Sequence, residues 1–100
     1  MSMALAENIL AESSLVVAAK DHIGCNLAGE EVILNLASGI YYGLNNVGSR
    51  IWELIQKPIT VGDILATVVS EYEVDRTQCE AAVSQFLAEL AEHGLLEKSS

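Results

Sequence analysis

The chain has 100 residues, enough for one domain with a single modest core but too few for a two-domain active-site cleft. Apolar residues make up 51% of it, charged residues 19%, and proline occurs once, which excludes a disordered chain. The formal net charge is −9 and the five lysines and arginines are scattered singly, so no basic patch can neutralise a run of phosphates, and direct nucleic-acid binding is not expected.

The first segments of the chain predict a small antiparallel sheet. Residues 1–14 have weak helical spacing and are expected to form a flexible arm, so the single domain spans residues 15–100. Residues 15–19 are a short apolar run typical of a strand, and residues 22–28 form a second strand candidate. A short turn joins that candidate to the strand that starts at Glu31.

A β-hairpin follows, because apolar residues occupy every second position from Glu31 to Leu44 on both sides of a turn at residues 37–39. The predicted buried face consists of Val32, Leu34, Leu36, Ile40, Tyr42 and Leu44. Tyr41 and Gly43 then face outward. Everything from residue 45 to residue 93 has the pattern of helices, so the strand at residues 40–44 is expected to keep an open edge.

After Leu44 the apolar spacing changes to that of a helix. Asn45 or Asn46 can cap its start and Pro58 ends it. The stripe that should face the core is Val47, Ile51, Trp52 and Ile55.

Two more helices are predicted. Thr60 followed by Asp63 resembles a capping box and starts a helix over residues 61–73. Asp75 caps a longer helix over residues 76–93, which Gly94 ends. Its core stripe is Cys79, Ala82, Val83, Phe86, Leu87, Leu90 and Ala91. An N-terminal three-stranded antiparallel sheet followed by three helices predicts an α+β fold of the winged helix-turn-helix type.

Residues that could carry chemistry are present but not arranged for it. Cys25 and Cys79 lack a CxxC or CxxH partner, so free buried thiols are expected, and no metal site. His22 has the position of a solvated residue at a strand start, and His93 that of a helix-end residue. We therefore expect no catalytic residue, no cofactor and no enzymatic activity.

The compartment follows from what the sequence lacks. No apolar run approaches the roughly 18 residues that span a bilayer, and the N-terminus has no basic start leading into a long apolar region. The sequence thus predicts a cytoplasmic protein without membrane contact. The acidic surface favours a basic or neutral partner, or only keeps a small apolar domain soluble.

The open edge of the hairpin has two interpretations on its residues alone. An exposed tyrosine at Tyr41 beside the bare backbone of Gly43 is typical of a strand-addition site for a peptide. It is equally typical of an ordinary amphipathic tyrosine beside a bend.

The segment VILNLASGIYYGLNNVGSRIWEL at residues 32–54, the helix after Thr60 and the ending FLAELAEHGLL resemble the PqqD-like family, also called RiPP recognition elements. The resemblance covers about residues 22–96. It implies a winged helix-turn-helix-like fold. It also implies that the chain binds the leader of a ribosomally made precursor peptide and presents it to a modifying enzyme or leader protease.

Carried onto this chain, the resemblance implies that the leader adds as a strand beside the third strand, residues 40–44, and lies against the third helix. The implied peptide-binding residues are Gly39, Ile40, Tyr41, Tyr42, Gly43 and Leu44 on the strand side, and Gln78, Cys79, Ala82, Val83 and Phe86 on the helix. Which of the helical residues face the peptide and which face the core stays open, although Phe86 is expected in the core.

The sequence leaves alternatives for the pathway, for the class of function and for the oligomeric state. A lasso-peptide pathway is preferred, with a peptide chaperone for a radical SAM enzyme in PQQ biosynthesis as the alternative. A winged-helix transcriptional regulator is an alternative of a different class, but the segment at residues 76–93 has one arginine and three glutamates, which disfavours it. Both a monomer and a dimer paired through the open edge strand fit the pattern.

Overall fold

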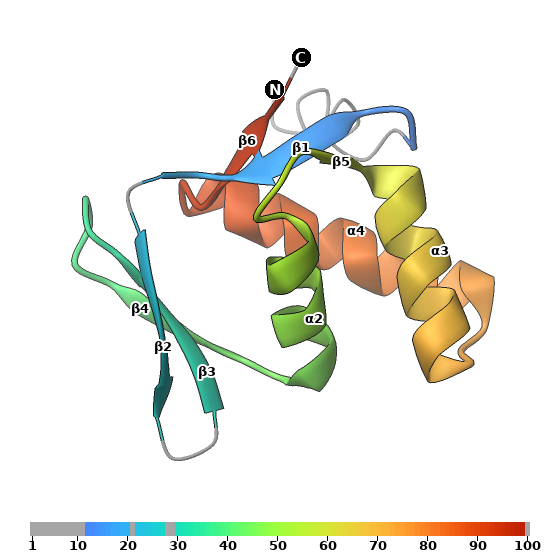
Figure 1. The fold of residues 1–100 in the computed structure, drawn as a ribbon, viewed down its shortest axis with the longest axis horizontal. Coiled ribbons are helices and arrows are strands. Elements are labelled where there is room, and N and C mark those ends of the chain that lie inside the picture. Colours follow the sequence, from blue (N-terminus) through green and yellow to red (C-terminus); the bar gives the residue numbers. More distant parts are fainter. Residues whose placement is uncertain (1–11, 21, 28–29, 100) are drawn as a thin grey trace.

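The computed structural model describes residues 12–20, 22–27 and 30–99. This part of the chain forms two small sheets and three helices, which confirms the predicted α+β class (Figure 1). In chain order the elements are β1 (Leu15–Ala18), β2 (His22–Leu27), β3 (Glu30–Asn35), β4 (Tyr41–Leu44), α2 (Asn46–Leu54), β5 (Ile59–Thr60), α3 (Val61–Tyr72), α4 (Arg76–Glu92) and β6 (Leu96–Lys98).

The predicted three-stranded antiparallel sheet is present, with the strand order β2–β3–β4. It stands to one side of the helices, and β4 leads straight into α2 (Figure 1). The expectation that β1 joins this sheet was wrong. β1 lies between β5 and β6 in a second antiparallel sheet, whose strand order is β5–β1–β6.

The second sheet is held together by segments distant in sequence. β5 is a two-residue strand in a region that the apolar spacing assigned to helices, and β6 follows α4. At the end of β1, the N–H of Ala18 donates to the carbonyl of Ile55 at 2.8 Å. The N–H of the next residue, Ala19, donates to the carbonyl of Leu95 at 2.9 Å. A two-residue strand carries no periodicity, so the sequence pattern could not indicate β5.

The buried face of β3 is the opposite of the predicted one. Ile33 is fully buried and Asn35 nearly so, while Val32 and Leu34 lie on the other face and Leu36 is exposed. The run of apolar residues 32–34 fits both phases of a period of two, and a shift of one residue exchanges the faces. In β4 the prediction holds for Tyr42 and Leu44, but Ile40 precedes the strand and is 53% exposed.

The three helix starts are capped as predicted. The Asn45 side chain accepts a hydrogen bond from the N–H of Gly48 at 2.7 Å, and the Thr60 hydroxyl accepts from that of Asp63 at 3.1 Å. Asp75 accepts from the N–H of Gln78 at 3.2 Å. At the end of α4, Gly94 has a φ of 74° and thus the expected left-handed conformation.

A single apolar core joins the helices, β1 and the inner faces of both sheets. From the predicted stripes, α2 contributes Ile51 and Trp52 and α4 contributes Leu87 and Leu90. Ala82 was expected among the core residues of α4 but is exposed, because it borders a surface cavity between the helices.

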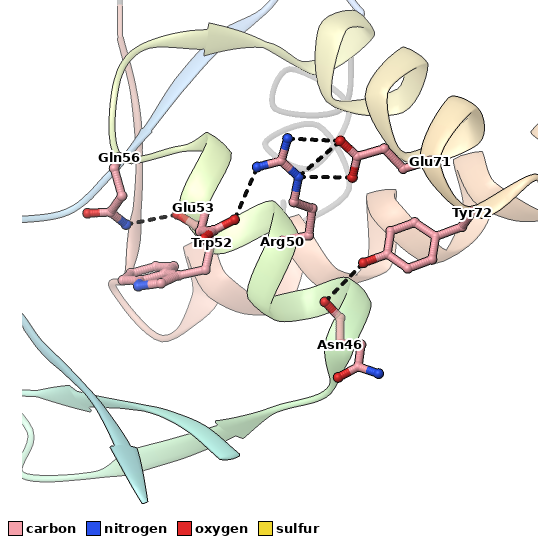
Figure 2. Close-up of polar contacts among 7 residues, drawn as sticks. All are labelled: Asn46, Arg50, Trp52, Glu53, Gln56, Glu71 and Tyr72. Atoms are coloured by element: carbon pink, nitrogen blue, oxygen red, sulfur yellow. Dashed lines mark hydrogen bonds and ion pairs between the residues drawn. The ribbon is translucent and has the colours of Figure 1, made fainter. Parts of the chain in front are cut away.

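The surfaces of α2 and α3 are joined by ionic contacts (Figure 2). The guanidinium group of Arg50 in α2 binds Glu71 in α3 at 2.9 Å and Glu53 in its own helix at 3.1 Å. The hydrogen bond to Arg50 lowers the pKa of Glu71. Near the same end of α3, the Tyr72 hydroxyl donates to the carbonyl of Asn46 at 3.4 Å. These exposed contacts connect α2 to the C-terminal half of α3.

Most of the predicted flexible arm, residues 1–11, lies outside the described residues. Its last part contacts the start of α3: the N–H of Gly62 donates to the carbonyl of Glu12 at 2.9 Å, and that of Val61 donates to the carbonyl of Ser14 at 3.0 Å. These bonds satisfy two N–H groups in the first turn of α3.

Replacing Gly94 with alanine should destabilise the protein by about 1 kcal/mol, because a side chain disfavours the left-handed conformation. The melting temperature should fall by roughly 5 °C in a thermal scan followed by circular dichroism. Gly43→Ala is the matched control, since Gly43 lies on an exposed strand with nothing within 4 Å of an added Cβ. Equal melting temperatures for the two variants would contradict this account of the helix end.

Candidate functional site

β4 is an edge strand of its sheet, and only alternate residues direct their backbone groups away from the sheet. The N–H of Asn35 donates to the carbonyl of Ile40 at 2.9 Å, and the register places Ile33 opposite Tyr42. In an antiparallel pair the hydrogen-bonded positions alternate, so Tyr42 and Leu44 direct their backbone groups toward β3, and Ile40 directs its carbonyl there. The backbone N–H and C=O of Tyr41 and Gly43 point to the open side. We call these four groups the β4 edge.

This arrangement narrows the predicted strand-side site. The family resemblance implied that all residues from Gly39 to Leu44 bind the peptide, but the N–H of Gly39 donates to the carbonyl of Asn35 within the turn. The side chains of Tyr42 and Leu44 lie on the inner face, whereas Tyr41 is 69% exposed on the outer one. Tyr41 and Gly43 face outward, as the sequence predicted.

A cavity of about 350 Å³ lies close to where β4 passes into α2. Its wall is formed by α2, the second half of α3, the loop after α3, and α4. The lining residues are Asn45, Val47, Gly48, Ile51, Val68, Val74, Gln78, Cys79, Ala82, Val83 and Phe86. Apolar side chains dominate this set, so the cavity suits an apolar group rather than a charged one.

The structure brings together all five helical residues that the sequence assigned to the site, since each of them lines this cavity. Cys79 and Val83 are buried in its wall, while Gln78 and Ala82 are exposed. Phe86 was expected in the core but is only half-buried. Its ring packs against α2 at Gly48, where an added Cβ would be 3.4 Å from two ring carbons. The absence of a side chain at Gly48 therefore brings the Phe86 ring close to α2.

The sequence did not assign the α2, α3 and loop residues of the cavity to a site. Val47 and Ile51 lie on the predicted core stripe, so their periodicity explained them as core residues. Val74 is 41% exposed between α3 and α4. The only hint in the sequence that Val74 belongs to the site is an apolar residue in the short loop between two helices. Whether such a residue lines a cavity depends on how the helices pack.

The side chains of Arg76, at the start of α4, and Arg50, in α2, are both paired with carboxylates. Arg76 contacts Glu12 at 3.3 Å and Glu80 at 3.6 Å, and Arg50 contacts Glu53 and Glu71. A helix that reads DNA needs free basic groups for phosphates. This pairing gives no support to the winged-helix regulator.

Both histidines lie beside aromatic rings, and the two cysteines belong to different elements. His22 was expected in solvent but is half-buried, with its ring 4.8 Å from that of Trp52. The His93 ring lies 4.7 Å from that of Tyr42. Cys25 is exposed, contrary to the prediction of two buried thiols, because it lies on the outer face of β2. Burial raises the pKa of the Cys79 thiol, and Arg76 opposes this shift more weakly.

Two features are absent from residues 12–20, 22–27 and 30–99, the part of the chain that the structure describes. No group of three or more His, Cys, Asp or Glu side chains there could hold a metal ion. No helix within these ranges has the length and apolar character required to cross a membrane.

Comparisons with known proteins agree with the family resemblance. A profile of the family described as coenzyme PQQ synthesis protein D (PqqD) matches residues 30–96. No curated protein matches the chain by sequence. Among solved structures, TbiB1 in complex with the TbiA(beta) leader peptide is 34% identical with a TM-score of 0.74, and the match covers 84% of this chain and 98% of that one.

Two other solved structures share the fold. A lasso peptide synthetase B1 complexed with the leader peptide is 25% identical, with a TM-score of 0.72 and coverage of 87% of this chain and 99% of that one. The PqqD truncation of PqqCD from Methylobacterium extorquens, a stand-alone RiPP recognition element, is 20% identical, with a TM-score of 0.71 and coverage of 87% and 93%. At that identity the likeness concerns the fold alone.

The two thiols should differ in reactivity. At neutral pH we expect Cys25 to react rapidly with a disulfide reagent such as DTNB and Cys79 slowly, because Cys79 is buried and its raised pKa keeps it protonated. The rate at Cys79 should therefore rise as the pH approaches the raised pKa of its thiol. A Cys25→Ser variant should lose the fast phase alone. A single rate for both thiols would contradict the burial of Cys79.

Proposed function

The chain belongs to the PqqD family, and on that premise we propose that it binds the leader segment of a ribosomally synthesised precursor peptide. The observation that carries the proposal is the β4 edge, an exposed strand edge that leads into an apolar cavity on α4. Support comes from TbiB1, a 34% identical relative whose structure contains a leader peptide.

Binding would use the β4 edge as a template for an added strand. The N–H and C=O groups of Tyr41 and Gly43 offer two donors and two acceptors to a peptide backbone, whatever the peptide's side chains. Gly43 has no side chain, and nothing lies within 4 Å of its Cβ position, so a second backbone can approach closely. The edge thus supplies affinity but little sequence preference.

Selectivity would come from the cavity. An extended peptide that continues past Leu44 reaches α2 and α4, where Val83 and Phe86 present apolar surface. If the added strand is antiparallel to β4, its N-terminal part is the part that enters this region. A leader with a bulky apolar or aromatic side chain upstream of the paired segment would fit such a cavity.

The bound leader would then be delivered to a leader protease or another peptide-modifying enzyme, and this chain would act as a non-catalytic adaptor in the cytoplasm. A lasso-peptide pathway is the preferred setting, because one of the similar structures is a lasso peptide synthetase B1 with a leader peptide. The alternative setting is PQQ biosynthesis, in which a PqqD-type protein serves a radical SAM enzyme.

The proposal is tested by fluorescence anisotropy with two labelled peptides. One is the TbiA(beta) leader, and the other is the leader of the precursor encoded beside this chain's gene. We expect saturable binding of at least the second peptide. If neither peptide gives a saturable change, leader binding by this chain is wrong.

Gly43→Pro should abolish or strongly weaken leader binding while the protein stays folded. Proline removes the Gly43 N–H donor, which points to the open side, so the pairing of β4 with β3 keeps its hydrogen bonds. The same anisotropy titration measures the loss, and circular dichroism checks the fold. Gly43→Ala retains the donor and should bind nearly as well as the unchanged chain. A folded Gly43→Pro variant with unchanged affinity would show that the peptide does not add to β4.

Ala82→Trp should weaken leader binding at least roughly ten-fold by filling the cavity with a large side chain. Ala81→Trp is the matched control, because Ala81 is the exposed neighbour on α4 and does not line the cavity. Both affinities are measured by titration with the same labelled leader. Equal affinities for the two tryptophan variants would mean that the cavity takes no part in binding.

A further inference from the structure

We propose that Asn35 is a positioning residue, whose side chain locks the β3–β4 hairpin onto the C-terminal end of α4. This contact would set the separation between the β4 edge and α4, on which peptide binding between them depends. The inference rests on the proposed function, since it concerns how the same site is held in shape.

The side chain of Asn35 links two elements that are 58 residues apart. It is 6% exposed, and a buried amide is costly unless its polar atoms have partners. Its Oδ1 accepts hydrogen bonds from the N–H groups of Ala37 at 2.9 Å and Ser38 at 3.3 Å, which shapes the hairpin turn. Its Nδ2 donates to the carbonyl of His93 at 2.7 Å, at the end of α4. One amide thus serves the turn and the helix end together.

Other contacts converge on the same junction. The ring of Tyr42, from β4, lies 4.7 Å from the ring of His93. Gly94 follows, and a Cβ at that position would be 3.6 Å from the Asn35 amide nitrogen. Both strands of the hairpin therefore meet the C-terminal end of α4, and the Asn35 amide packs at van der Waals distance from the Gly94 position.

A directional contact is required there because the remaining contacts of the hairpin are mostly non-directional. Ile33 and Leu44 pack into the core through apolar surface, which tolerates small sliding movements. A hydrogen bond at 2.7 Å has a fixed length and a preferred angle. Without it, the hairpin would stay attached but shift relative to α4, and a peptide would no longer contact both at once.

The test is Asn35→Asp in the full chain. The aspartate keeps the acceptor for Ala37 and Ser38 but, when ionised, cannot donate to the His93 carbonyl. In the unliganded protein we expect the nuclear Overhauser effect between the rings of Tyr42 and His93 to weaken. We also expect the affinity for the leader peptide that saturates the unchanged chain to fall roughly ten-fold, at a temperature where circular dichroism shows full folding.

Two controls separate positioning from general stability. Ser38→Ala removes a hydrogen bond inside the turn, from the N–H of Ile40 to the hydroxyl at 3.3 Å, and should leave the affinity unchanged. Ile64→Val lowers stability from a buried site in α3 and should also leave the affinity unchanged. If Asn35→Asp does not fold, Asn35→Ser takes its place, because its hydroxyl can still accept from the turn N–H groups but is too short to reach the His93 carbonyl.

The outcomes are distinct. Weaker binding by the Asn35 variant together with unchanged binding by both controls supports the positioning role. Unchanged binding by a folded Asn35→Asp variant, with the unchanged chain binding normally, overturns the role but leaves the proposed function intact. Absence of leader binding to the unchanged chain overturns the proposed function and the positioning role together.

Discussion

The attachment of the β2–β3–β4 sheet to the helices is the constraint on which the candidate site depends. The sheet stands beside the helical part of the molecule and contributes few side chains to the shared core, among them Ile33 and Leu44 (Figure 1). Each of these contributes about 2 kcal/mol by burial, enough to hold the sheet but not to define its angle. Polar and ring contacts supply that definition at two places, His22 with Trp52 and Asn35 with the end of α4.

This attachment explains why the β4 edge and the cavity can act together. β4 ends at Leu44, and Asn45 immediately caps α2, so no flexible linker separates the strand from the first wall of the cavity. The opposite wall is α4, whose far end holds the hairpin turn. A peptide on β4 would thus meet surfaces whose relative positions are set by contacts at both ends of the strand. In the proposed mode of binding, backbone pairing and side-chain selection belong to different elements, which is a general solution for binding peptides that share a backbone and differ in sequence.

Much of the fold and of the candidate site could be predicted from the sequence, because the sequence patterns that indicate them span only a few residues. Asn45, Thr60 and Asp75 are side-chain caps whose partners lie three residues away, so the helix starts were correct within a residue. The open strand and the outward direction of Tyr41 also followed from short-range alternation. The helical residues assigned to the site line one cavity because helical spacing alone places them on neighbouring faces.

The sequence by itself determined the order of β2, β3, β4 and the three helices, the helix caps and an exposed edge strand beside a glycine, since each depends on neighbours a few residues apart. Only the tertiary structure decided which face of β3 is buried, because residues 32–34 fit both phases and the choice depends on Asn35 finding a partner 58 residues away. It also decided that β1 pairs with β5 and β6, and that Phe86 lies at the border of the core, where it lines a cavity. Those outcomes follow from contacts between distant segments, whose geometry no local pattern encodes.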